Sequence, residues 1–290
     1  MSDTTDAKKT AEEIAAYWTR ERRDKAKERP LKPAGERPVE VLTPEGAPQG
    51  APETHPGHDP DGQALKASDV AFTVTPATRV PNPTQYPWRT VGKLYFSSGG
   101  DDYTGSASVI YRNTILTAAH NLYVGGVWSK DILFVPAYTY PNDPYGSWTW
   151  SSASVMPEWI PGENESNDVG TVELRVGGAA GRSIGDVVGY LGYTINRSLP
   201  REWDDVGYPR NYDEKRYMYQ QPGLYTRSLD GGNTVGKVGD TEGGASGGPW
   251  LMPPGDLNFV NGLHSFRQGG DVFSPYFRTT VGNFIQAHLK

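Results

Sequence analysis

From about residue 71 to its end, the chain is divided into short apolar runs by glycine, proline, asparagine and aspartate, and this spacing most constrains its fold. The runs are rich in aromatic and β-branched residues, which is typical of half-buried strands. They are VGKLYF, GSASVIY, TILTAA, DILFV, VGTVEL, DVVGYLGY, YMYQQ and FVNGLHSF. The 35 glycines and 24 prolines fit the many turns between them. The pattern predicts an all-β sandwich or barrel, and only VGNFIQAHLK at residues 281–290 has helical spacing.

The first quarter of the chain has a different composition. Thr10 followed by Glu13 forms a capping box and predicts a helix over about residues 11–28, with Ile14, Tyr17 and Trp18 on one face. Because this apolar face is narrow, we expect the helix to dock on a larger body. The Pro-, Gly- and Glu-rich stretch that follows predicts a linker or a disordered segment. Its HPGHDPDG run holds four potential metal ligands without a rigid frame, so we expect no metal there.

The charge distribution narrows the range of partners. The net charge is −6, and residues 1–40 hold ten Lys and Arg against nine Asp and Glu, which leaves eighteen basic against twenty-five acidic residues beyond them. This acidic body lacks the basic stripe that a nucleic acid requires. No apolar run approaches the roughly 20 residues of a membrane helix, and the first residues lack the pattern of a secretory signal. Without cysteine, the chain forms no disulfide and no thiolate metal site.

The stretch GGASGGPW at residues 243–250 contains a candidate nucleophile, Ser246. Catalysis by a serine hydroxyl requires a base and hydrogen-bond donors for the oxyanion. Glycines leave backbone N–H groups uncovered, so the N–H groups of Gly244 and Ser246 are candidate donors. A flexible Gly/Ser surface turn is the alternative interpretation of the same stretch.

Few residues of the chain are candidates for the base that Ser246 requires and for the carboxylate that orients this base. Of the five histidines, His120 ends the run TILTAAH, where a strand end can hold a side chain firmly. Asp168 directly precedes the strand VGTVEL and could be buried beside an imidazole. Asp204 and Asp205 are adjacent and would repel each other if both were buried. Taken singly, His120 and Asp168 could also have purely structural roles.

Together, LTAAH, DVG and GASGGP resemble the His, Asp and Ser motifs of the chymotrypsin-like serine peptidases, in the same order and about 48 and 78 residues apart. The resemblance implies two six-stranded antiparallel β-barrels with a C-terminal helix, and polypeptide substrates. It implies His120 as the general base, Asp168 as its orienting carboxylate and Ser246 as the nucleophile, with an oxyanion hole of Gly244 and Ser246. No cofactor and no metal are expected, and we expect a monomer.

Further motifs resemble the glutamyl endopeptidase branch of that family. They are ATRVPNPTQYPWRTVGKLYF, VGYP at 206–209 and DTEGGASGGP at 240–249. In that branch the positions of Thr241 and His264 recognise an acidic P1 side chain, since a hydroxyl and an imidazole can donate to a carboxylate. The alternative is that His264 is a core histidine and the pocket takes another side chain. We also expect the backbone near Ser265 and Phe266 to pair with the bound peptide.

The resemblance covers about residues 68–290 and sets residues 1–67 apart. By analogy with that branch, residues 1–67 are a pro-region that is removed near Lys66 to Ala71, and the mature enzyme is extracellular. A permanent N-terminal interaction arm is the competing interpretation. For the whole chain, the competing function is that of a catalytically silent homologue that binds a protein partner.

Overall fold

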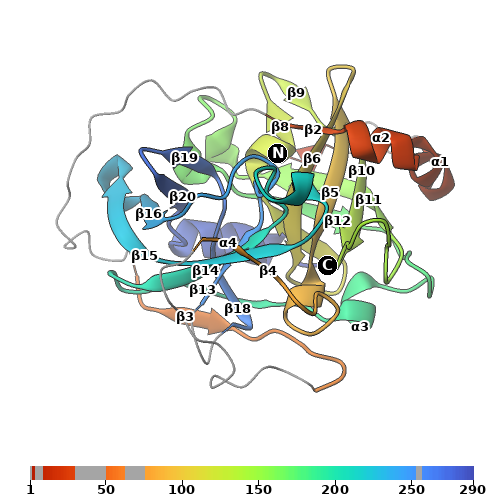
Figure 1. Ribbon diagram of the computed structural model, residues 1–290. Coiled ribbons are helices and arrows are strands. Elements are labelled where there is room, and N and C mark those ends of the chain that lie inside the picture. Colours follow the sequence, from red (N-terminus) through yellow and green to blue (C-terminus); the bar gives the residue numbers. More distant parts are fainter. Residues whose placement is uncertain (1, 4–8, 30–49, 63–75, 253–256) are drawn as a thin grey trace.

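Six antiparallel strands of the computed structural model close into a first barrel, seen with β5, β10 and β11 in Figure 1. The strand order is β11-β10-β5-β6-β7-β12, and pairing of β11 with β12 closes the ring. Their bounds are β5 Val91–Ser98, β6 Asp101–Val109, β7 Thr114–Thr117, β10 Lys130–Pro136, β11 Trp148–Val155 and β12 Gly170–Leu174. The structure describes residues 2–3, 9–29, 50–62, 76–252 and 257–290. A small hairpin of β8 (Tyr123–Val124) and β9 (Val127–Trp128) lies beside this barrel.

A second antiparallel barrel follows in the order β20-β16-β15-β14-β17-β18. Its strands are β14 Glu202–Gly207, β15 Tyr219–Leu229, β16 Thr234–Val238, β17 Pro249–Leu251, β18 Phe259–Leu263 and β20 Asp271–Pro275. The seam between β18 and β20 is bridged where the Ser265 N–H donates to the Phe273 carbonyl at 2.9 Å. Strand β19 (Phe266–Gln268) forms a hairpin with β20. The helix α4 (Thr279–Ala287) buries Val281 and Ile285, so the predicted two barrels and C-terminal helix are confirmed.

One predicted strand is wrong in its first half. The run DVVGYLGY begins inside α3 (Ile184–Val188), and only β13 (Gly192–Ile195) is a strand. Gly189, at a φ of 78°, ends the helix in a conformation that favours glycine. The run therefore contains a helix end, a turn and a strand, which an apolar run alone does not distinguish.

The N-terminal residues pack on the first barrel, where α1 and α2 lie at its outer side in Figure 1. The predicted helix is divided into α1 (Ala11–Tyr17) and α2 (Arg20–Lys25). The capping box at Thr10 is present. Trp18 leaves the helix, buries its ring against Tyr95 and donates its Nε1–H to the Asp131 carbonyl. Thr19 then begins α2 as its N-cap, where its hydroxyl accepts the Arg22 N–H. Two short strands, β1 (Ser2–Asp3) and β2 (Lys27–Glu28), pair with β11 and β6.

The predicted linker is wrong for residues 50–62, which are ordered against the second barrel. Strand β3 (Glu53–His55) pairs with β13, whose other edge is occupied by β18. A free strand edge is a ready site for another strand, which explains this docking. Asp59 forms a buried ion pair with Arg89 at 2.7 Å. Residues 30–49 and 63–75 lie outside the described residues, and β4 (Thr78–Arg79) then pairs with β15.

Neither a metal nor a membrane is indicated by the described part of the chain. Within it, no group of three His, Cys, Asp or Glu side chains is arranged to hold a metal ion. None of the helices found there has the length and apolar character needed to cross a membrane.

Candidate active site

His120 and Asp168 form a buried pair at the edge of the first barrel. After β7 the chain turns into a 3-10 helix, η3 (Ala119–Asn121), which carries His120 inward. Its Nδ1 lies 2.7 Å from Asp168 Oδ2, and its backbone N–H donates to Asp168 Oδ1 at 2.8 Å. Both side chains have no exposed surface. Since a carboxylate accepts hydrogen bonds, Nδ1 carries the hydrogen, and Nε2 holds the lone pair that a general base uses.

Asp168 is held by more contacts than the sequence indicated. It follows the 3-10 helix η5 (Glu165–Asn167), which Arg278 anchors by donating to the Asn167 side chain at 2.6 Å. The Ser265 hydroxyl donates to Asp168 Oδ2 at 2.6 Å. Three donors therefore compensate the burial of this carboxylate. We expected Ser265 to contribute its backbone to substrate binding, and no motif in the sequence indicates this side-chain contact.

Ser246 lies in the loop between β16 and β17, between the two barrels. Its carbonyl accepts the Ser106 N–H at 2.8 Å and the Asn121 side-chain amide at 3.0 Å. The next residue, Gly247, donates its N–H to the His264 carbonyl at 2.8 Å. The loop is therefore fixed beside the residue that follows His120. His120 Nε2 is buried and has no hydrogen-bond partner in the described structure, so the Ser246 hydroxyl does not bond to it in this state.

The glycines of this loop permit its close approach to the first barrel. Gly244 has a φ of +95°, and a Cβ there would lie 2.5 Å from the Tyr208 carbonyl. At Gly247, with a φ of +85°, a Cβ would lie 2.1 Å from Thr117 Oγ1. Among the described residues, the N–H groups of Gly244 and Ser246 have no intramolecular acceptor. They are two free donors in one turn, as an oxyanion requires.

Thr241 and His264 meet at a carboxylate that the sequence analysis did not select. Thr241 Oγ1 donates to Asp205 Oδ2 at 2.8 Å, and His264 Nδ1 lies 2.9 Å from the same oxygen. All three residues are at most 2% exposed. Burial alone would raise the pKa of Asp205, but the His264 imidazolium and these hydrogen bonds hold that pKa below its usual value.

The expectation that Asp204 and Asp205 are not both buried is wrong, because each is 1% exposed. Both lie in β14, where successive side chains point to opposite faces, which separates the two carboxyl groups. Asp205 is balanced by His264. Burial raises the pKa of Asp204 to about 7, although the cation of Lys237 opposes this shift.

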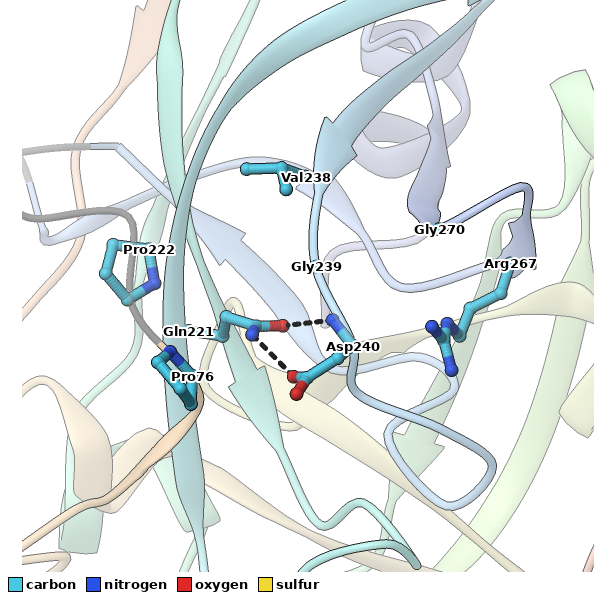
Figure 2. A pocket seen from close by; sticks show the side chains of 8 residues that line it. All are labelled: Pro76, Gln221, Pro222, Val238, Gly239, Asp240, Arg267 and Gly270. Carbon is cyan, nitrogen blue, oxygen red and sulfur yellow. Dashed lines mark hydrogen bonds between the residues drawn. The ribbon is translucent and has the colours of Figure 1, made fainter.

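A cleft of about 420 Å³ opens beside Thr241, and Asp240 is one of its lining residues. Figure 2 shows Gln221 hydrogen-bonded to Asp240, with Arg267 on the far side of Asp240. Gln221 Oε1 also accepts the Thr241 N–H, at 3.3 Å. The cleft is lined by Pro76, Gln221, Pro222, Val238, Gly239, Asp240, Arg267 and Gly270. Neither predicted P1-binding residue is among these residues, since Thr241 and His264 are buried next to the cleft.

Comparison with solved structures identifies several proteases with the same fold. Protease Anisep from Arthrobacter nicotinovorans is 26% identical, with a TM-score of 0.62, over 67% of this chain and 93% of that one. The thermostable serine protease AL20 from an extremophilic microorganism is 24% identical, with a TM-score of 0.63, over 69% and 98%. A Glu endopeptidase crystallised with MPD is 21% identical, with a TM-score of 0.60, over 73% and 95%. No protein-family model and no curated protein matches the chain.

Proposed function

Because the chain has the fold of the chymotrypsin-like serine peptidases, we propose that it is a serine endopeptidase that hydrolyses peptide bonds through an acyl-enzyme on Ser246. The observation that carries this proposal is the buried His120–Asp168 pair. The Nε2 atom of His120 has no hydrogen-bond partner among the described residues, and the next residue, Asn121, anchors the loop that contains Ser246. A structural histidine would use both ring nitrogens, whereas this one keeps a lone pair unpaired.

In the proposed reaction, His120 Nε2 accepts the proton of the Ser246 hydroxyl as Oγ attacks the peptide carbonyl. The N–H groups of Gly244 and Ser246 donate to the oxyanion that forms. The imidazolium is stabilised by Asp168 and then gives its proton to the leaving amine. Water, activated in turn by His120, hydrolyses the acyl-enzyme. The chain's own residues provide each proton transfer.

We propose further that the enzyme prefers glutamate at P1, and aspartate less. Asp205 Oδ2 holds His264 at Nδ1, and when the ring is doubly protonated its Nε2–H can donate to a substrate carboxylate. Since Thr241 donates its hydroxyl hydrogen to Asp205, it acts by positioning this pair. Lys237, buried in the same barrel, donates to the carbonyl of Gln221 in the wall of the cleft. An uncharged P1 pocket is the competing possibility.

We also propose that residues 1–67 are a pro-region and that the mature enzyme is extracellular, on the resemblance alone. Intact mass after self-processing tests this proposal. A fully active chain that keeps Met1 would argue for a permanent N-terminal arm instead.

Labelling with a fluorophosphonate tests whether the protein is an enzyme. We expect one adduct per chain, located on Ser246 by mass spectrometry, and no adduct in His120→Ala. His288→Ala is the matched control, because His288 packs on Phe284 of α4 and should label normally. Absence of labelling in the wild-type chain would favour the catalytically silent homologue.

Cleavage of paired peptides with Glu or Gln at P1 tests the proposed preference. A hydrogen bond to a charged group contributes about 1.5–3 kcal/mol, which is about 10- to 150-fold in kcat/KM. We expect Asp205→Asn to lose most of this Glu preference. Asp186→Asn, which removes a partly exposed partner of Arg112, should keep this preference. An unchanged preference in Asp205→Asn would refute the proposed role of the pair.

A further inference from the structure

The end of the N-terminal segment lies against the candidate catalytic loop. Lys27 and Glu28 pair with Tyr103 and Thr104 of β6. Two residues further along β6, Ser106 donates its N–H to the Ser246 carbonyl. A Cβ at Gly243 would lie only 2.9 Å from Glu28 Cγ. Glu28 is therefore in contact with the turn that contains the proposed oxyanion donors.

Arg29 fixes the same segment on the His120 side. Its Nη1 donates to Ser129 Oγ at 2.8 Å, and Ser129 Oγ donates to the Asn121 carbonyl at 2.7 Å. Glu28 and Arg29 thus extend from the residue after His120 to the loop that contains Ser246.

The Glu28 carboxylate is held by two cations of the second barrel. Lys215 Nζ lies 2.5 Å from Oε1, and Arg210 Nη1 lies 3.8 Å from Oε2. The side chains of Glu28 and Lys215 are only 19% and 14% exposed. Burial alone would raise the pKa of Glu28, but its hydrogen bonds to Lys215 and to the backbone, together with the charges of Lys215 and Arg210, lower that pKa. The contact is therefore a charged pair in a largely desolvated position, where it is stronger than a surface pair.

Lys215 lies in a segment of three consecutive non-glycine residues with positive φ values. Asp213, Glu214 and Lys215 have φ values of 46°, 51° and 65°, which non-glycine residues rarely adopt. The buried Lys93 fixes this segment by donating to the Lys215 carbonyl at 2.9 Å. The Lys215 side chain also packs on Gly244, where a Cβ would lie 3.0 Å from its Cγ and Cδ. Strain of this kind persists at functional sites because the surrounding contacts maintain it.

On the premise of the peptidase function proposed above, we propose that Lys215 and Arg210 form a subsite for an acidic side chain on the leaving-group side of the scissile bond. In the full-length chain, Glu28 fills this subsite and competes with substrate. The assignment of the side follows from the position of the Ser246 loop. Gly247 donates its N–H to the carbonyl of His264, which follows β18, and the Ser246 carbonyl accepts the N–H of Ser106 in β6. If the acyl part of a substrate pairs beyond His264, at Ser265 and Phe266, the leaving part extends toward β6, where Glu28 lies.

Peptide binding to the full-length Ser246→Ala chain tests this subsite without catalysis. The probes are fluorescein-labelled peptides with Glu at P1 and either Glu or Gln at each of the three positions after the scissile bond. At one of these positions we expect the Glu peptide to bind at least tenfold tighter than its Gln partner by fluorescence anisotropy. Adding Glu28→Gln should tighten binding of the Glu peptide at least fivefold, because the internal competitor loses its charge.

Two further variants test whether Lys215 causes the difference in binding between the Glu and Gln peptides. Adding Lys215→Met should abolish the difference between the Glu and Gln peptides, whereas Lys25→Met, which removes an exposed lysine of α2, should keep it. Equal binding of the two peptides at all three positions in the Ser246→Ala, Glu28→Gln chain would overturn the subsite, as would no binding of either peptide. Failure of the peptidase function is recognised separately, by absence of fluorophosphonate labelling in the wild-type chain.

Discussion

Removing the Ser265 hydroxyl is a direct test of the hydrogen-bond network around Asp168. In Ser265→Ala, Asp168 Oδ2 loses the donor at 2.6 Å and keeps only His120 Nδ1. Oδ1 remains bonded to the His120 N–H. The carboxylate is fully buried, so water does not readily replace the lost donor. The variant therefore weakens the orientation of Asp168 and leaves the three proposed catalytic side chains unchanged.

The magnitude follows from the charge and burial of the acceptor. A hydrogen bond to a charged group contributes about 1.5–3 kcal/mol. If this stabilisation is needed when the His120 imidazolium forms, its loss lowers kcat/KM by about 10- to 150-fold. The loss should appear in kcat more than in KM, because the imidazolium exists only after attack has begun.

The assay compares the rate of fluorophosphonate labelling with kcat and KM for a peptide that has Glu at P1. Ser274→Ala is the matched control, since its hydroxyl is also fully buried but bonds to the backbone of Leu263 and Pro275. Ser265→Thr keeps a hydroxyl and should restore most of the rate. A Ser265→Ala enzyme within twofold of wild type, or an equal loss in Ser274→Ala, would refute the reasoning.

Two other predictions concern stability and the oxyanion turn. Burial lowers the pKa of Lys93 from 10.5 to about 7, so the unfolded chain binds more protons between these values and wild-type stability increases with pH across this window. In denaturant unfolding, the stability advantage of Lys93→Met over wild type should therefore shrink by up to about 4 kcal/mol from pH 7 to pH 10.5, and a pH-independent difference would contradict the assignment. Gly244→Ala should lose labelling by more than tenfold and be less stable by at least about 1 kcal/mol, because its Cβ meets the Tyr208 carbonyl. Gly100→Ala is the control, because Gly100 has a similar φ of +93° but open space around the position of a Cβ. An equal loss of labelling in the two variants would contradict the role of the Tyr208 contact.

The local pattern of the sequence was sufficient to predict the strands and the terminal helix, whereas the two barrels were predicted only from the resemblance of the three motifs. Strand periodicity, turn residues and a capping box act over a few neighbouring residues, so they can be recognised without knowing which strands pair. The same holds for the motifs around His120, Asp168 and Ser246, each of which is a short stretch at a strand end or turn.

Contacts between distant residues depended on the tertiary structure. Asp205 meets His264 across 59 residues, Ser265 meets Asp168 across 97, and Glu28 meets Lys215 across 187. Sheet register decides such contacts, because a shift of one residue turns a side chain to the opposite face. The burial of adjacent Asp204 and Asp205 has the same origin: the alternation of β14 separates two carboxyl groups that are neighbours in the sequence.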